Sequence, residues 1–198
     1  MQKRSAATRM QILEAAERVF AHSGFDSSGV AEICQAAGVS KGAFYYHFPS
    51  KQAVFLELLQ NWLAGLEQHL EQVHQQNQTV PQSLLQMAGA IREVFQAADG
   101  RLPIFLEFWI QASREPTFWA ATIAPYRQFQ RFFAELVTIG VEQGSLQAVD
   151  PQSSSRVIIA LAVGMLFQGL LDPHGDDWAQ VTQEGMRYLL NGLAAEAL

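Results

Sequence analysis

The segment GVSKGAFYYHFPSK, residues 38–51, concentrates side chains that could bind a polyanion. Lysine, histidine and tyrosine side chains can contact phosphate groups, and they stand here beside small residues that let another macromolecule approach closely. The segment is too short to form a core of its own. These residue types therefore indicate a binding surface for a phosphate polymer.

A short turn and a helix are predicted around this surface. Ala37-Gly38-Val39-Ser40 has the length and glycine content of the turn in a helix-turn-helix unit. Ser40 is a natural N-cap for a helix over 41–47, and Val39 and Phe44 occupy the two positions of a hydrophobic staple. The angle at which this helix begins is therefore specified locally.

The predicted helix over 41–47 has two different faces. At about 100° per residue, Phe44 and Phe48 form one stripe that can pack inward, while Tyr46 lies on the opposite side between Gly42 and Ala43. An α-helix fits the major groove of B-DNA, where small residues permit close approach and an aromatic edge can touch the thymine methyl group. Gly42, Ala43 and Tyr46 are therefore predicted to face base pairs.

The margins of the same helix are predicted to face phosphates. Lys41, Tyr45, His47 and Lys51 are placed to reach the two walls of the groove. Lys51 also begins the next helix, whose backbone amides could hold a phosphate. Two alternatives stay open: Tyr45 could be partly core, and His47 could cap the end of the helix.

The stretch VAEICQAAGVSKGAFYYHFPSKQAVFLELL, residues 30–59, resembles the DNA-binding region of TetR-family transcriptional regulators. The helical remainder is similar in size and layout to that family's ligand-binding and dimerisation domain. The sequence departs from the family pattern at Gly29, where a hydroxyl residue is common, and at Cys34, where alanine is common. The resemblance implies that the DNA-contact positions of the family are Lys41, Gly42, Ala43, Tyr45, Tyr46, His47 and Lys51, with Ser28 near a helix start that often touches phosphate.

The charge of the chain is unevenly distributed. The chain has 198 residues and a formal net charge of −6, which argues against binding to nucleic acid through net charge alone. Residues 1–51 carry six basic and four acidic residues, and the remainder carries seven basic and fifteen acidic residues. This asymmetry indicates a small cationic module on a larger acidic body. Cys34, the single cysteine, excludes an internal disulfide and is interpreted as a small buried hydrophobe.

Apolar residues recur at helical spacing nearly throughout, so we expect an all-α fold. Residues 1–50 are predicted to form a three-helix, helix-turn-helix domain, and 51–198 a larger helical domain for ligand binding and dimerisation. The sequence predicts nine or ten helices: 8–24, 29–36, 41–47, 51–76, 81–98, 103–113, 117–143 (kinked or split at Pro125), the apolar helix 157–171, and 177–195.

Aromatic residues cluster again between 102 and 133, where they could be ordinary core or could line a small-molecule site. Glu107 would favour a cationic ligand, and Arg127 with Arg131 an anionic one. The acidic run 172–177 resembles a metal site only in composition; Asp176 is expected to cap the last helix, and no cofactor is expected. The candidate ligand-binding residues are Trp62, Met87, Phe105, Phe108, Trp109, Tyr126, Phe129, Phe133 and Phe167.

The last two helices are expected to form a homodimer interface, because a single recognition helix reads only a few base pairs. The apolar stretch 157–171 is shorter than the roughly 20 residues that cross a bilayer, so no membrane span is expected. The first ten residues lack the apolar run of a signal peptide, which favours the cytoplasm. The predicted interface comprises Ala160, Val163, Gly164, Leu166, Gly169, Leu170, Trp178, Val181, Met186, Tyr188, Leu189 and Leu193.

Taken with the resemblance, these features predict a dimeric repressor that binds a palindromic operator in double-stranded DNA and is released by a small apolar or aromatic effector. Two other classes stay open: a helical DNA-binding protein without a ligand, and a small helical enzyme that uses an apolar cavity. The enzyme has little support, because no nucleophile and base share a motif, and His69 and His74 do not share a helix face as metal ligands would.

Overall fold

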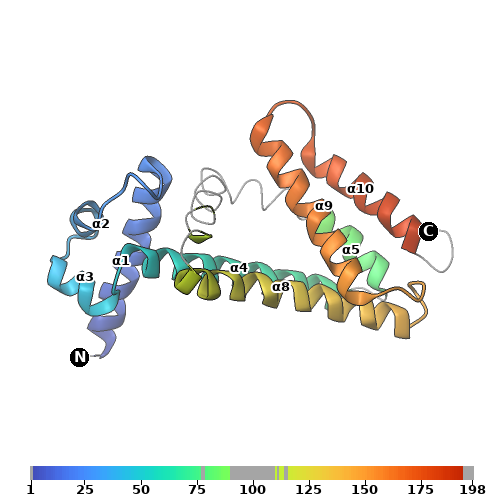
Figure 1. The fold of residues 1–198 in the computed structure, drawn as a ribbon, viewed down its shortest axis with the longest axis horizontal. Coiled ribbons are helices and arrows are strands. Elements are labelled where there is room, and N and C mark those ends of the chain that lie inside the picture. The colour runs from blue at the N-terminus through green and yellow to red at the C-terminus, as the bar shows by residue number, and fades with distance from the viewer. Residues whose placement is uncertain (1, 77–78, 90–109, 111, 114–115, 194–198) are drawn as a thin grey trace. The chain divides into compact units, whose positions relative to one another are not determined.

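The computed structural model describes residues 2–76, 79–89, 110, 112–113 and 116–193, and over these residues the chain is all-α (Figure 1). Eight helices lie in this part, whereas the sequence predicts nine or ten for the whole chain; most of the predicted helix 103–113 falls outside the described residues. The helices are α1 (Gln2–Ser23), α2 (Val30–Ala37), α3 (Lys41–His47), α4 (Lys51–Gln75), α5 (Val80–Gly89), α8 (Pro116–Glu142), α9 (Pro151–Leu171) and α10 (Trp178–Leu193).

The chain divides into two compact units, and both α4 and α8 contribute to each of them. The first unit comprises Met1–Leu63 and Gly100–Ala124, and the second comprises Ala64–Asp99 and Pro125–Leu198. The first unit therefore extends past residue 50, because Val54, Phe55 and Leu59 of α4 belong to its core. α8 is a single helix that contains Pro125, so the segment is not split there.

Aromatic packing holds the first unit together. The rings of Phe20, Phe25 and Phe55 lie with their centroids 5.1–5.7 Å apart in tilted and edge-on arrangements. Ile12 of α1 and Ile33 of α2 are fully buried beside them. Tilted and edge-on aromatic pairs of this kind add stabilisation beyond the area that they bury.

Two helices begin earlier than the sequence predicts. α1 starts at Gln2 rather than at Thr8, because the residues between them are mostly good helix formers that extend the helix past the predicted cap. α9 starts at Pro151 rather than near residue 157. The carboxylate of Asp150 accepts a hydrogen bond from the Ser153 amide at 2.8 Å, and Pro151 occupies the first helical turn, where proline is tolerated.

The hydrogen bonds that cap α9 also perturb its capping residue. Hydrogen bonding by the Ser153 side chain, together with the Ser153 amide, holds the pKa of Asp150 below its ordinary value. The charged form of the carboxylate is therefore the form that caps the helix. The last helix is capped in the same manner by Asp177 rather than by Asp176, through the Gln180 amide at 3.2 Å.

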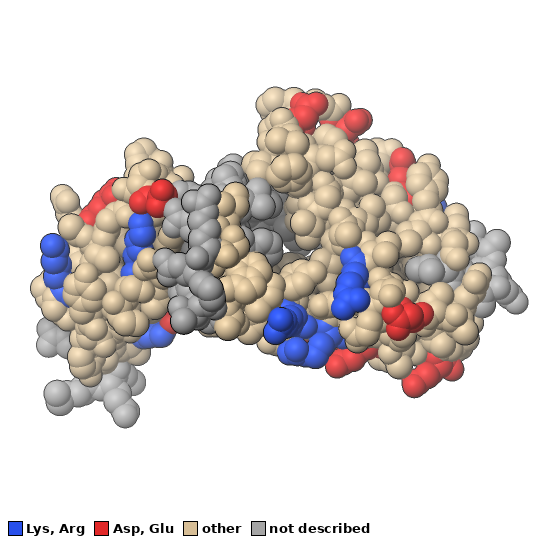
Figure 2. Space-filling model, in the orientation of Figure 1, with Lys and Arg blue, Asp and Glu red and all other residues tan. Residues whose placement is uncertain are grey.

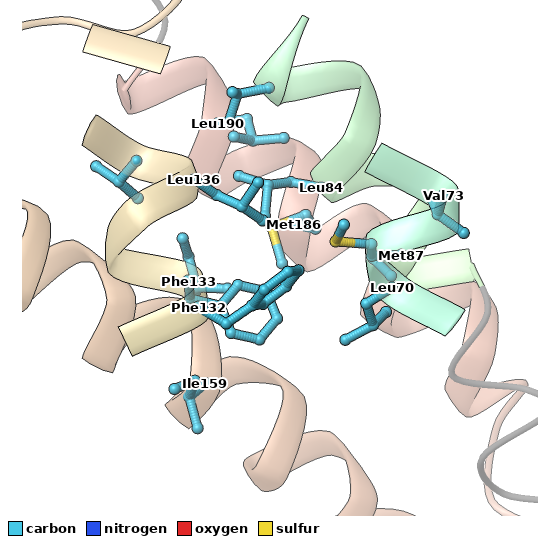
Figure 3. Close-up of a cluster of buried hydrophobic side chains, with 14 of the residues drawn as sticks. Leu70, Val73, Leu84, Met87, Phe132, Phe133, Leu136, Ile159, Met186 and Leu190 are labelled. Carbon is cyan, nitrogen blue, oxygen red and sulfur yellow. The ribbon is translucent and has the colours of Figure 1, made fainter. Parts of the chain in front are cut away.

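Five helices supply the core of the second unit. Figure 3 shows side chains from α4, α5, α8, α9 and α10 in one cluster, with the rings of Phe132 and Phe133 below Met186 in this view. Met87 of α5 and Leu70 of α4 lie at the edge of the same cluster. Apolar side chains make up this cluster, as in an ordinary protein core.

α9 leaves most of its apolar surface exposed within the chain. It is 21 residues long and apolar, so by length and composition alone it could cross a membrane, yet only 22% of its most apolar window is buried inside the chain. Because the helix is longer than residues 157–171, its length alone does not exclude a membrane span. The exposed apolar surface of α9 requires another explanation, which the other described helices do not provide.

Candidate nucleic-acid interface and effector domain

The turn between α2 and α3 forms as the sequence predicts. Gly38 adopts a left-handed conformation with φ of 66°, and its amide closes the end of α2 on the carbonyl oxygens of Cys34 and Gln35. The hydroxyl of Ser40 accepts a hydrogen bond from the Ala43 amide at 3.1 Å, which caps α3. The direction of α3 is thus determined at both ends of the turn.

The inward face of α3 consists of Phe44 and Phe48, which are both buried. Their ring centroids lie 6.2 Å apart. The guanidinium of Arg9 lies 4.8 Å from the centre of the Phe48 ring and forms a bidentate ion pair with Glu57. Arg9 of α1 therefore contacts α4 through Glu57 and covers the C-terminal end of α3 through Phe48.

The opposite face of α3 is open to solvent. Tyr46 is 80% exposed and Tyr45 is 55% exposed, which is unusual for large aromatic residues. Lys41 is exposed as well. The ring of His47 stands edge-on to that of Tyr46 with centroids 5.0 Å apart, and no hydrogen bond holds it among the described residues. The exposure of Tyr45 favours its surface role over the core alternative, and the lack of a hydrogen bond to the half-buried His47 ring among the described residues favours its surface role over the capping alternative.

Gly42 has no structural reason to be glycine within this chain. Its backbone is helical, and a Cβ atom added there would meet only the Ser40 hydroxyl oxygen, at an ordinary 3.8 Å. Glycine in a helix costs up to about 1 kcal/mol relative to alanine. A surface that needs close approach by a partner would explain this cost.

Ser28 and Lys51 serve the fold rather than the open face. The Ser28 hydroxyl is buried and donates to the carbonyl oxygen of Phe25 at 2.9 Å. The ammonium of Lys51 donates to the carbonyl oxygens of Phe25, Asp26 and Ser28 at 2.7, 3.1 and 2.7 Å, and it lies 4.6 Å from the Phe25 ring centre. An ammonium has three donors, so these bonds occupy Lys51, and neither side chain belongs to the surface formed by α3.

Basic side chains do not form one continuous patch on the face of the first unit that Figure 2 shows. In Figure 2 the blue side chains over α1–α4 are separated by uncharged surface. A surface with few charges and exposed aromatic groups matches base contact supplemented by a few phosphate contacts.

The predicted ligand-binding residues do not form one group. Met87, Tyr126, Phe129 and Phe133 share the core cluster of the second unit, whereas Trp62 packs against the core of the first. Phe167 is 46% exposed on α9. Phe105, Phe108 and Trp109 lie outside the described residues, as does Glu107. Of the polar candidates, Arg127 and Arg131 are exposed on α8, and no group of three metal-ligating side chains occurs in the described part of the chain.

Sequence reasoning missed one polar residue in the second unit. Gln130 of α8 has a buried side-chain nitrogen, Nε2, without a hydrogen-bond partner among the described residues. The signal was present in the sequence, because Gln130 stands between Tyr126 and Phe133 at helical spacing on an otherwise apolar stripe.

The capped α2–turn–α3 unit, with one face anchored and the other open, defines a helix-turn-helix protein of the DNA-binding class. Residues 12–58 match the family model described as "Bacterial regulatory proteins, tetR family", and residues 81–194 match "BetI-type transcriptional repressor, C-terminal". The chain belongs to the TetR family of transcriptional regulators. It is therefore a DNA-binding regulator of transcription and not an enzyme.

Known relatives agree with this assignment along most of the chain. The HTH-type transcriptional regulator UidR of Escherichia coli (strain K12) is 25% identical over 200 residues, covering 98% of this chain and 96% of that protein. The A-factor receptor protein of Streptomyces griseus is 27% identical over 194 residues, covering 98% of this chain and 66% of the receptor. The solved structure of FadR from Bacillus subtilis in complex with stearoyl-CoA has a TM-score of 0.78 at 17% identity, covering 92% of this chain and 98% of that one, which shows the shared fold.

The three carbonyl bonds of Lys51 predict a stability effect. Lys51→Met keeps most of the side-chain stem but removes the ammonium, so we expect the free energy of unfolding in urea to fall by about 1–3 kcal/mol. The control Lys41→Met changes an exposed lysine and should alter stability by less than about 0.5 kcal/mol. Equal stability of the two variants, measured at one protein concentration, would show that the Lys51 bonds contribute nothing to the fold.

Proposed function

We propose that this regulator is a repressor that binds a two-fold symmetric operator as a homodimer in the cytoplasm and is released by a small, largely apolar effector. The observation that carries the DNA part is the division of α3 into a buried phenylalanine face and an exposed face. The chain would accordingly work as two functional parts, a DNA-reading part within 1–50 and an effector and dimerisation part within 51–198.

The exposed face of α3 supports a specific set of contacts. Gly42, Ala43 and Tyr46 would face base pairs in the major groove, because they lie opposite the anchored phenylalanines. Lys41, Tyr45 and His47 would contact phosphates along the groove walls. Ser28 and Lys51 are left out of this set because their polar groups are bonded within the fold.

Selection of bound fragments from random double-stranded DNA tests this function. We expect an inverted repeat with half-sites about one helical turn, roughly 10 base pairs, apart or a multiple of it. Tyr46→Ala should change the preferred half-site. Lys41→Ala should keep the preference, weaken binding to all sequences, and lower the salt-dependence slope by about one unit. If both variants select the wild-type site with wild-type affinity, the contact set is wrong.

The dimer proposal accounts for the exposed apolar surface of α9. Val157, Val163, Phe167 and Leu171 are all exposed and fall on one side of the helix, and Leu171 is 69% exposed. A Cβ atom at Gly164, on the same side, would meet nothing within 4 Å, so a partner helix could approach closely there. Tyr188 of α10 is exposed too. Met186 does not belong to this surface, because it is buried in the core of the second unit.

Disruption of this surface should separate dimerisation from folding. Phe167→Asp places a charge on a side chain that is exposed within the chain, so the helical circular dichroism should be retained while light scattering reports a monomer. Operator affinity should then fall by about a hundredfold or more, because the helix-turn-helix of the second protomer is no longer held near its half-site at a high effective concentration. Gln143→Asp, an exposed change just after α8, is the control. A monomeric wild type, or a dimeric Phe167→Asp variant, would contradict this interface.

The effector proposal is supported by the composition of the second unit and by a neighbour in fold. Tyr126, Phe129 and Phe133 place aromatic rings on α8 in contact with an apolar cluster that also includes Met87. The FadR structure of similar fold is described in complex with stearoyl-CoA, a ligand with a long apolar chain. An apolar effector in this region would suit both observations.

α4 offers a route from effector to DNA. It is continuous from Lys51 to Gln75. Lys51 and Glu57 tie its first turns to the helix-turn-helix region, and Leu70 and Val73 belong to the core of the second unit. An effector that binds better to a conformation with α4 in a different position would raise the population of that conformation. Operator affinity would then fall by the same factor by which bound DNA lowers the affinity for the effector.

A further inference from the structure

Gln130 interrupts the buried stripe of α8. Phe133 and Ala134 lie three and four residues after it and Val137 seven residues after it, so all of them share its side of the helix. These three residues are buried, with exposed fractions of 7%, 4% and 0%. A leucine or methionine at position 130 would continue the stripe, so an amide here requires an explanation.

The amide nitrogen of Gln130 carries the argument. Nε2 is buried and has no hydrogen-bond partner among the described residues. A buried donor without an acceptor loses its hydration without compensation, and native proteins contain few such groups. Turning the amide by half a rotation would not help, because a buried oxygen would then lack a donor. The Nε2 atom therefore lies where the described residues do not supply an acceptor.

Aromatic residues stand before and after Gln130 on α8. The Phe129 and Phe133 rings stand edge-on with centroids 5.2 Å apart, and Phe132 and Phe133 likewise at 5.3 Å. Tyr126 lies one turn before Gln130 on the same side of the helix. A few polar groups among apolar and aromatic side chains are the arrangement by which small-molecule sites fix the orientation of a ligand.

We propose that Gln130 is a specificity-determining residue of the effector site: its Nε2 donates a hydrogen bond to an acceptor oxygen, such as a carbonyl, on an otherwise apolar effector. This inference rests on the proposal that the second unit binds an effector. It adds the chemistry of recognition, because an apolar molecule without an acceptor would leave the donor unsatisfied and would bind less tightly. The proposal commits to an acceptor because the buried atom is the nitrogen.

Two variants of the full-length protein, freed of small molecules by unfolding and refolding, test the inference. Gln130→Met keeps the length of the side chain and removes the amide. Gln128→Met is the matched control on the same helix, where the amide is exposed and donates to Glu67 at 2.9 Å. Without any ligand, Gln130→Met should keep or raise the Tm, because no internal hydrogen bond is lost. A lower Tm than that of the control would reveal an internal partner and overturn the inference.

The binding test uses straight-chain methyl ketones, each paired with the alkane of the same length. We expect the wild type and Gln128→Met to bind the best ketone about tenfold more tightly than its alkane, as a ligand-induced rise in Tm or by calorimetry. Gln130→Met should bind the two alike, with the alkane affinity unchanged. Equal responses to ketone and alkane in the wild type, including no response across the series, overturn the inference, as does a preference that survives in Gln130→Met.

Operator release is measured separately with the same molecules. If the ketone preference depends on Gln130 but no molecule changes operator affinity, the recognition chemistry stands and the repressor proposal fails. If ketones and alkanes release the operator equally well from the wild type and from Gln130→Met, the effector proposal stands and the role of Gln130 fails. The two proposals can therefore fail independently.

Discussion

Burial of Phe44 and Phe48 is the interaction on which the DNA-reading surface depends. α3 has only seven residues, and a helix of that length is not stable in water without tertiary packing. The two phenylalanines supply that packing, while the Ser40 cap and the left-handed Gly38 set the direction in which the helix leaves the turn. Because one face is anchored, the other must point outward, and Tyr46 is exposed as a direct consequence.

Two cations connect the elements that surround this anchored helix. Arg9 pairs with Glu57 and covers Phe48, and Lys51 binds three carbonyl oxygens of the segment between α1 and α2. Both residues count among the six basic residues of the N-terminal segment 1–51. The charge balance of that segment therefore overstates the charge available to DNA. In the proposed contact set, base contact by α3 would accordingly have a larger share in recognition.

The sequence predicted most of the DNA-reading region because its signals are local. The Gly38 turn, the Ser40 cap and the angular separation of Phe44 from Tyr46 all follow from neighbouring residues, and the structure confirms each of them. Contacts between residues far apart along the chain could not be predicted from the sequence. Lys51 and Lys41 are both lysines of one motif, and only the fold shows that one meets carbonyl groups of a distant segment while the other stays in solvent.

The second unit was harder to predict because its apolar residues look alike in sequence. Met186 was expected at the dimer interface and lies in the core, whereas Phe167 was expected at a ligand and lies exposed on α9. Aromatic spacing alone does not say whether a ring packs against its own chain, a second copy or a ligand. Gln130 was overlooked because a glutamine in an amphipathic helix ordinarily faces solvent. Its place on the stripe of Tyr126 and Phe133 was a signal in the sequence, but only the fold shows that its Nε2 atom is buried.

The central claim is that the outward face of α3 is shaped for DNA rather than for folding, and Gly42→Ala tests it most directly. Operator affinity and the free energy of unfolding are measured on the same protein. We expect opposite changes: stability rises by up to about 1 kcal/mol, because alanine favours the helix and meets only the Ser40 oxygen, while operator affinity falls by about tenfold or more, about 1.4 kcal/mol. Unchanged operator affinity, or a loss of stability that accounts for the weaker binding, would contradict it.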